Sequence, residues 1–177
     1  MRVVFDTCVL VPSFLRAVLL SCAETGNVEF IVSPRILEEW VRAAKTPLHR
    51  LETKTAVAQF RLKFETSIRP DPISLVQFWL PDPDDIHILA LAVHQHADAI
   101  VTHNKKDFPQ SELSSYGIER INPDAFLRRL LKQHGAEVAF ATQPIMAEVC
   151  AAHINLSESD IWRKAWLPQF GRLIKKL

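Results

Sequence analysis

Acidic side chains recur in this sequence at four places where a strand would end or a helix would begin. They are Asp6 after the apolar run Val3-Val-Phe, the pair Glu38/Glu39, the pair Asp84/Asp85, and Asn104 with Asp107. Carboxylates that a fold brings together repel one another and lose hydration, so such a group usually holds a cation. Because hard oxygen ligands favour Mg²⁺ or Mn²⁺, the pattern predicts a site for one of these ions.

Strands and helices alternate along most of the chain. Apolar, β-branched runs predict strands at residues 3–5, 29–32, 74–80, 98–102 and 117–121, and helical spacing predicts helices at 12–23, 34–44, 53–65, 84–97 and 124–133. This order predicts an α/β fold with a parallel sheet covered by helices on both faces. The acidic positions then fall near the carboxyl ends of the strands, where open α/β sheets bind their ligands.

The alternating pattern ends near residue 134. Residues 138–153 and 157–167 have helical spacing, and residues 171–177 form a basic, amphipathic tail. We therefore predict a domain over residues 1–134 and a helical extension over 135–177. We expect the extension to serve packing or oligomer contacts rather than contact with RNA.

Composition describes a soluble globular protein. The chain has 177 residues, 48% hydrophobic and 23% charged, with a formal net charge of +1, which fits one domain with a small appendage. Its three cysteines show no paired spacing, so neither a disulfide framework nor a zinc knuckle is expected, and a reducing cytoplasm fits. Since no apolar run approaches the roughly 18 residues of a membrane span, we predict a cytoplasmic location with no membrane contact.

Positive charge is concentrated in one segment. Residues 40–69 hold seven Lys/Arg and two Glu, which leaves a net charge of +5. Such a segment could bind a polyanion, and it could equally be the solvated face of a helix.

Two acidic pairs leave the choice of residue open. On a helical wheel Glu38 and Glu39 lie on opposite sides of the apolar arc, with Glu39 only slightly favoured, and either could serve as favourable charge in the first helical turn. Asp84, which follows Pro83, is a natural helix cap, and Asp82 could do no more than shape the turn. Asp107 could likewise cap a loop or helix before Phe108-Pro109.

The four motifs in this order resemble the PIN-domain nucleases, and most closely the VapC-like branch of toxin–antitoxin ribonucleases. The similar stretches are Val3-Val-Phe-Asp-Thr-Cys-Val-Leu10, Ser33-Pro-Arg-Ile-Leu-Glu-Glu39, Asp82-Pro-Asp-Asp-Ile-His-Ile-Leu89 and Ile100-Val-Thr-His-Asn-Lys-Lys-Asp-Phe108. The resemblance covers about residues 1–130. It implies a PIN-like three-layer fold, with a small parallel sheet flanked by helices, and Mg²⁺- or Mn²⁺-dependent cleavage of RNA.

The resemblance also selects the site residues. It assigns metal-ligand and catalytic roles to Asp6, Glu39, Asp85 and Asp107, a further ligand position to Asn104, and supporting hydroxyl positions to Thr7 and Thr102. It implies hydrolysis that leaves a 5′-phosphate and a 3′-hydroxyl, a cognate antitoxin that covers the acidic cleft, and a homodimer. We expect the RNA backbone to contact Arg42, Lys45, Arg61, Lys63, Lys105 and Lys106.

Other readings of the same residues remain. Asn104 stands where the PIN pattern often has an Asp, so the chain could be a catalytically degenerate scaffold that binds RNA or a protein partner without cutting. The histidines at 87, 94, 96 and 103 are interpreted as surface residues and not as zinc ligands. Cys8 is interpreted as a small buried residue and not as a nucleophile.

Overall fold

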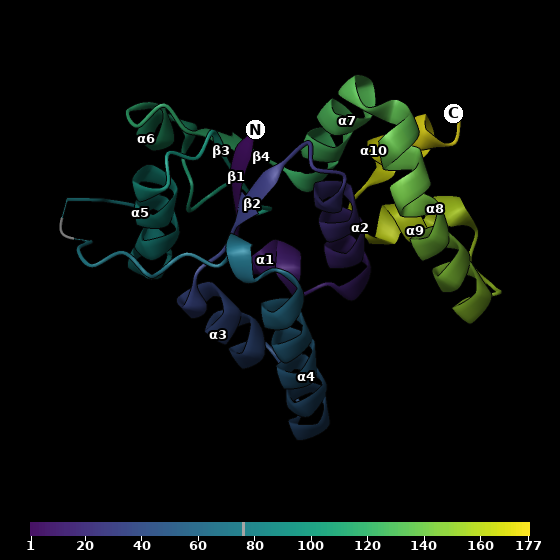
Figure 1. Cartoon of the computed structure of the whole chain (residues 1–177), viewed down its shortest axis with the longest axis horizontal. Helices are drawn as coiled ribbons and strands as arrows, with labels where there is room; N and C mark the ends of the chain where they lie inside the picture. Colours follow the sequence, from purple (N-terminus) through teal and green to yellow (C-terminus); the bar gives the residue numbers. More distant parts are fainter. Residues whose placement is uncertain (76) are drawn as a thin grey trace. The chain divides into compact units, whose positions relative to one another are not determined.

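The computed structural model describes residues 1–75 and 77–177 (Figure 1). The strands are β1 (Arg2–Phe5), β2 (Glu29–Ile31), β3 (Ala99–Val101) and β4 (Glu119–Ile121). The helices are α1 (Thr7–Leu10), α2 (Ser13–Glu24), α3 (Pro34–Arg42), α4 (Pro47–Lys63), α5 (Ile86–His94), α6 (Gln110–Ser114), α7 (Pro123–Gln133), α8 (Gly135–Ala152), α9 (Glu158–Lys164) and α10 (Pro168–Ile174). Two 3₁₀ turns, η1 (Glu65–Ser67) and η2 (Pro83–Asp85), complete the set.

The four strands form one sheet in the order β2-β1-β3-β4, flanked by helices. β1 pairs in parallel with both neighbours, with Val3 opposite Phe30 of β2 and Ala99 of β3. Val3 and Val4 are fully buried, as expected for a central strand covered on both faces. The predicted α/β class with a small parallel sheet is confirmed.

The chain divides into two compact units that do not follow sequence order. The first unit contains residues 1–11 and 29–120, and the second contains residues 12–28 and 121–177. The second unit thus joins α2 and α7 to the three helices of the predicted C-terminal extension. The division into domains at residue 134 stays a prediction.

An aromatic cluster fills the core of the first unit. Phe30 of β2 stacks on Phe5 at 5.2 Å between ring centroids and meets Phe60 of α4 edge-on at 6.0 Å. Phe60 also meets Trp40 of α3 edge-on at 6.0 Å. These aromatic contacts tie α3 and α4 to the sheet.

In the second unit, α10 packs on α9 through Trp162 and Phe170, whose rings lie 5.3 Å apart. Gly171 sits directly under the Trp162 ring, where a Cβ would overlap the ring atoms. Asp124 of α7 accepts hydrogen bonds from the backbone N–H groups of Gln169 and Phe170 at the start of α10. The basic tail is therefore a packed helix in its first half.

The helix predicted over 12–23 is present as α2, and a further short helix, α1, precedes it because Asp6 caps a turn directly after β1. Two other sequence predictions differ from the structure. The helix predicted from residue 53 begins at Pro47, since Thr46 accepts a hydrogen bond from the N–H of His49 and Pro suits the first helical turn.

The strand predicted over 74–80 is also wrong for its described residues; residue 76 lies outside them. Residues 74, 75 and 77–80 form turns and irregular backbone. Pro72 and Pro81 bracket the segment, and a proline cannot donate a backbone hydrogen bond to a neighbouring strand. Phe78 and Leu80 are nevertheless buried, so the segment packs on the core without joining the sheet. No helix within the described residues is both long and apolar enough to cross a membrane.

Candidate metal site

Asp6 is placed by the end of the central strand. It follows β1 directly, is 5% exposed, and its Oδ1 accepts a hydrogen bond from the backbone N–H of Cys8 at 3.3 Å, which caps α1. Its Oδ2 accepts from Thr102 Oγ1 at 2.5 Å and from Cys8 Sγ at 3.0 Å. Thr102 therefore supports the Asp6 carboxylate, as the resemblance implies.

The loop after β3 brings the fourth motif to the same edge of the sheet. Thr102 Oγ1 accepts a hydrogen bond from the backbone N–H of Asn104 at 2.8 Å. Asn104 Oδ1 accepts from the backbone N–H of Asp107 at 3.2 Å, and its Nδ2 donates to Asp85 Oδ2 at 3.1 Å. Asn104 thus joins the two acidic residues through its amide.

The turn before α5 carries the third motif. Asp82 is the N-cap of this turn, because its Oδ1 accepts from the backbone N–H of Asp84 at 2.9 Å. The assignment of the cap to Asp84 is therefore wrong; Asp84 is exposed, and a cap two residues earlier serves the 3₁₀ turn that precedes α5. Asp85 is half-buried at the start of α5.

Three carboxylates converge at this edge. Asp82, Asp85 and Asp107 each offer an oxygen, and these oxygens lie within 4.8 Å of one another. Burial, as the largest cause, and the negative charges of Asp6, Asp82, Asp107 and Glu39 together raise the pKa of Asp85 to about 7. Charged residues of all four motifs therefore affect the pKa of Asp85.

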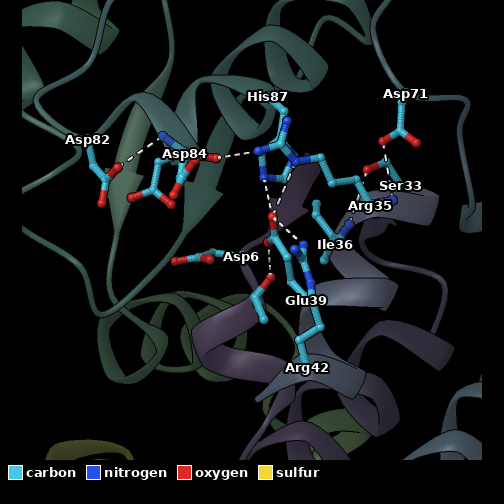
Figure 2. A network of polar contacts seen from close by, with 12 residues as sticks. Asp6, Ser33, Arg35, Ile36, Glu39, Arg42, Asp71, Asp82, Asp84 and His87 are labelled. Carbon is cyan, nitrogen blue, oxygen red and sulfur yellow. Dashed lines mark hydrogen bonds and ion pairs between the residues drawn. The ribbon is translucent and has the colours of Figure 1, made fainter.

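Glu39 lies beside this cluster but outside the 4.8 Å group. Its Oε2 accepts a hydrogen bond from Thr7 Oγ1 at 2.7 Å, so Thr7 supports a carboxylate as expected. Its Oε1 lies 3.4 Å from Arg35 Nε and 3.7 Å from Arg42 Nη2 (Figure 2). Burial acts to raise the pKa of Glu39, yet contacts with His87, Thr7 and Arg35 outweigh it and lower the pKa. Glu38, by contrast, is exposed.

His87 is buried, at 2% exposure, so its assignment to the surface is wrong. It is the second residue of α5, and its Nε2 lies 2.9 Å from Oε1 of Glu39 on α3 (Figure 2). The distance fits a hydrogen bond, but neither ring nitrogen has an aligned partner among the described residues. The contact is therefore a close polar approach whose N–H group is poorly aligned with the carboxylate oxygen. His94, His96 and His103 are exposed, as predicted.

Two residues of the site were not assigned by sequence reasoning. The sequence favours Asp82 as a turn residue. Its i,i+3 spacing to Asp85 across a proline turn is nevertheless a signal that the two carboxylates could lie together. His87 gave no comparable signal, because an isolated histidine in an apolar helix does not reveal which element it faces.

Cys8 lies within the site but is not activated. Burial, with the charge and hydrogen bond of Asp6, raises the pKa of the Cys8 thiol to about 12. The thiol therefore stays protonated and donates to Asp6, which excludes a thiolate nucleophile at neutral pH.

The predicted RNA-binding residues fall into four places. Arg42 and Arg61 line a groove of about 360 Å³ between α3 and α4, and Lys45 lines a second groove of about 340 Å³ at the start of α4; Lys54 borders both. Lys63 lies over the Phe64 ring at 5.3 Å. Lys105 and Lys106 are exposed in the loop that follows Asn104.

Comparison with known proteins agrees with this geometry. A family model described as PIN domain matches residues 2–106, which include the first three acidic motifs and Asn104 of the fourth but end before Asp107. The chain belongs to the PIN-domain family. A stretch of 43 residues of this PIN protein is 49% identical to the protein named Putative ribonuclease VapC50 from Mycobacterium tuberculosis. That match spans 24% of this chain and 25% of the relative, and no solved structure matches.

The donor set of this PIN domain fits a divalent cation. All the converging ligand atoms are carboxylate oxygens, which suit Mg²⁺ or Mn²⁺ better than softer metals. Burial and the neighbouring negative charges all raise the pKa of Asp85, so a positive charge placed among these carboxylates, such as a bound cation, would relieve the repulsion.

Proposed function

We propose that this PIN domain is a metal-dependent endoribonuclease that hydrolyses RNA phosphodiester bonds, and that it is the toxin of a toxin–antitoxin pair. The observation that carries the proposal is the convergence of Asp82, Asp85 and Asp107, whose carboxylate oxygens lie within 4.8 Å of one another. The charges of these neighbours, with those of Asp6 and Glu39, add to burial in raising the pKa of Asp85. Family membership and the local identity to a relative named as a ribonuclease support the reaction class.

The residues of the chain have distinct roles in the proposed reaction. Asp85, Asp107 and Asp82 would hold Mg²⁺ or Mn²⁺, with Asp6 beside them and Glu39 acting directly or through water; Asn104 is proposed as a further ligand position or as the link between Asp85 and Asp107. When bound, the ion supplies an activated water and offsets charge on the phosphate. Hydrolysis then leaves a 5′-phosphate and a 3′-hydroxyl.

Substrate binding is assigned to the exposed cations. Lys105 and Lys106 lie in the loop next to Asn104, where they would contact a phosphate flanking the cut. Arg42, Lys45 and Arg61 line grooves along α3 and α4 that would steer the RNA backbone. Lys63 is assigned the same role. The antitoxin partner, the homodimer and the cytoplasmic location stay predictions.

RNA cleavage assays test the proposal. The wild type is incubated with RNA and Mg²⁺ or Mn²⁺, with excess EDTA, and in parallel with Asp6→Asn. We expect EDTA to abolish cleavage and Asp6→Asn to reduce it about 100-fold or more, because the substitution removes a buried charge beside the cation. Asp84→Asn, an exposed neighbour, is the matched control and should cut normally. Equal cleavage by Asp6→Asn and wild type would contradict the site assignment.

A second function has one observation in its favour. Asn104 contributes no charge to the fourth motif, and its amide oxygen already accepts from the N–H of Asp107. A scaffold that binds RNA without cutting it would bind Mn²⁺ and show no turnover in the same assay, so the two functions give different results.

A further inference from the structure

His87 is a buried polar residue to which the proposed hydrolysis gives no role. It is 2% exposed on α5, between Asp85 of the acidic cluster and the fully buried Ile88. All five residues from Ile88 to Ala92 on this helix are apolar and buried. A polar ring in such surroundings needs a reason, because buried polar groups are nearly always hydrogen-bonded.

The close polar neighbour of the ring is Glu39. His87 Nε2 lies 2.9 Å from Glu39 Oε1, while neither ring nitrogen has an aligned hydrogen bond within residues 1–75 and 77–177. Catalytic hydrogen bonds in unliganded sites are often poorly aligned and tighten when the ligand binds. The ring is therefore close enough to hold Glu39 once the carboxylate is drawn toward a cation.

The other neighbours of Glu39 cannot replace His87. Thr7 occupies the second oxygen, Oε2, and Arg35 and Arg42 approach Oε1 from α3 itself at 3.4 and 3.7 Å, with side chains 35% and 67% exposed. Of these four described partners of Glu39, only His87 belongs to α5, the helix that Asp85 directly precedes as N-cap. The contact thus links the second acidic motif to the third.

We propose that His87 is a positioning residue that fixes the Glu39 carboxylate beside the acidic cluster and so strengthens divalent-cation binding. The inference rests on the proposed metal-dependent function. A neutral imidazole that donates from Nε2 is sufficient for this role. Because the ring is buried, it does not touch the RNA, and it acts through Glu39 alone.

Isothermal titration of the protein with Mn²⁺ tests the proposal without any RNA. We compare the wild type with His87→Leu, which keeps the bulk and removes the donor, and with His87→Gln, whose amide can donate from near the Nε2 position. His87→Leu should weaken Mn²⁺ binding about tenfold and His87→Gln less than about threefold, as for other residues that orient metal ligands. Arg163→Gln, which removes an exposed ion pair with Asp160 on α9, is the control and should change the affinity less than about twofold.

A double-mutant cycle with Glu39→Gln separates positioning from general structural damage. If His87 acts through Glu39, adding His87→Leu to Glu39→Gln should change Mn²⁺ affinity by less than about twofold. An independent tenfold loss in that background would overturn the proposal, as would wild-type affinity in folded His87→Leu. A wild type that binds no Mn²⁺ would overturn it too.

Two further comparisons keep the test decisive. Should His87→Leu fail to fold, His87→Gln is compared with His87→Asn, whose shorter amide does not reach Glu39; equal Mn²⁺ affinities for these two would overturn the proposal. In RNA cleavage His87→Leu should lower kcat and leave KM unchanged. If the wild type binds Mn²⁺ with the expected dependence on His87 but cuts no RNA, the positioning role stands and the proposed ribonuclease function fails.

Discussion

The pKa of Asp85 is raised by carboxylates from all four acidic motifs. Its carboxyl group lies within reach of Asp82 and Asp107, and the charges of Asp6 and Glu39 also act on it. Burial and this repulsion together make ionisation less favourable and raise the pKa of Asp85 to about 7. Protons and metal ions therefore compete for the same oxygen atoms.

This competition predicts an unusual dependence of stability on pH. The unfolded chain releases the Asp85 proton near its ordinary pKa of 3.8, whereas the folded protein keeps it up to about 7. Between these values the folded state binds more protons, so raising the pH lowers the free energy of unfolding. In EDTA, we expect the melting temperature to fall between pH 5 and 7.5 more steeply for the wild type than for Asp85→Asn. Parallel curves for the two proteins would contradict the raised pKa.

Asp82 offers a second test at the residue scale. Asp82→Asn keeps an oxygen that can cap the turn at Asp84 but removes one of three converging charges. Mn²⁺ binding, measured by calorimetry, should weaken about tenfold, which is about 1.4 kcal/mol. Asp84→Asn removes an exposed charge from the same turn and serves as the control. Comparable losses in both variants would mean that only the net charge of the turn matters.

At the scale of elements, single residues often serve both the fold and the site. Asp6 ends β1, caps α1 and faces the acidic cluster, so the geometry of a strand end sets the position of a carboxylate. Ser33 caps α3, the helix that presents Glu39. Capping, which depends only on neighbouring residues, thus helps to position Asp6 and the helix that carries Glu39.

The packing of α10 against α9 predicts a large effect of one methyl group. A Cβ at Gly171 would overlap the Trp162 ring, so Gly171→Ala should lower the free energy of unfolding by about 1–3 kcal/mol, measured by urea denaturation. Gly135→Ala is the matched control, because its Cβ would meet only Leu177 at 3.5 Å, an ordinary contact. Equal stability of the two variants would show that Trp162 can move aside.

At the scale of the whole molecule, the two compact units are interleaved along the chain. α2 packs on α8 and α7 packs on α10 within the second unit, although residues 12–28 lie early in the sequence. A chain that ends at residue 134 would expose the apolar faces of α2 and α7 to water. We expect it to be less soluble and to lack a cooperative thermal transition. A chain that ends at residue 174 is the control, and a soluble, cooperative 1–134 fragment would support the domain boundary predicted from sequence.

The uneven charge predicts how RNA binding depends on salt. Lys45 and Arg61 belong to the segment of net charge +5 and line the grooves along α4. In the Asp6→Asn background, which prevents cleavage, Lys45→Gln and Arg61→Gln should each reduce the slope of log affinity against log salt by about 1. Lys132→Gln, an exposed change on α7, should leave the slope unchanged. Unchanged slopes in all three variants would favour the solvated-face interpretation.

Local sequence determined much of the candidate site. Caps and strand ends are short-range features, so Asp6, Ser33-Pro34 and the order of strands and helices could be predicted from residues near one another. The helical wheel separated Glu38 and Glu39 only slightly; in the structure Glu39 contacts Thr7 and His87 whereas Glu38 is exposed, and the site role of Glu39 stays a prediction. These choices depend on helix and strand geometry that a few consecutive residues fix.

Tertiary structure alone decided what these residues meet. The burial of His87 against Glu39 joins two helices 48 positions apart, and the pKa of Asp85 depends on carboxylates from four separate segments. The irregular backbone of the described residues in 74–80 and the grouping of α2 with the C-terminal helices also depend on contacts between distant segments. Burial and charge repulsion arise from distances between segments, and those distances do not exist until the chain has folded.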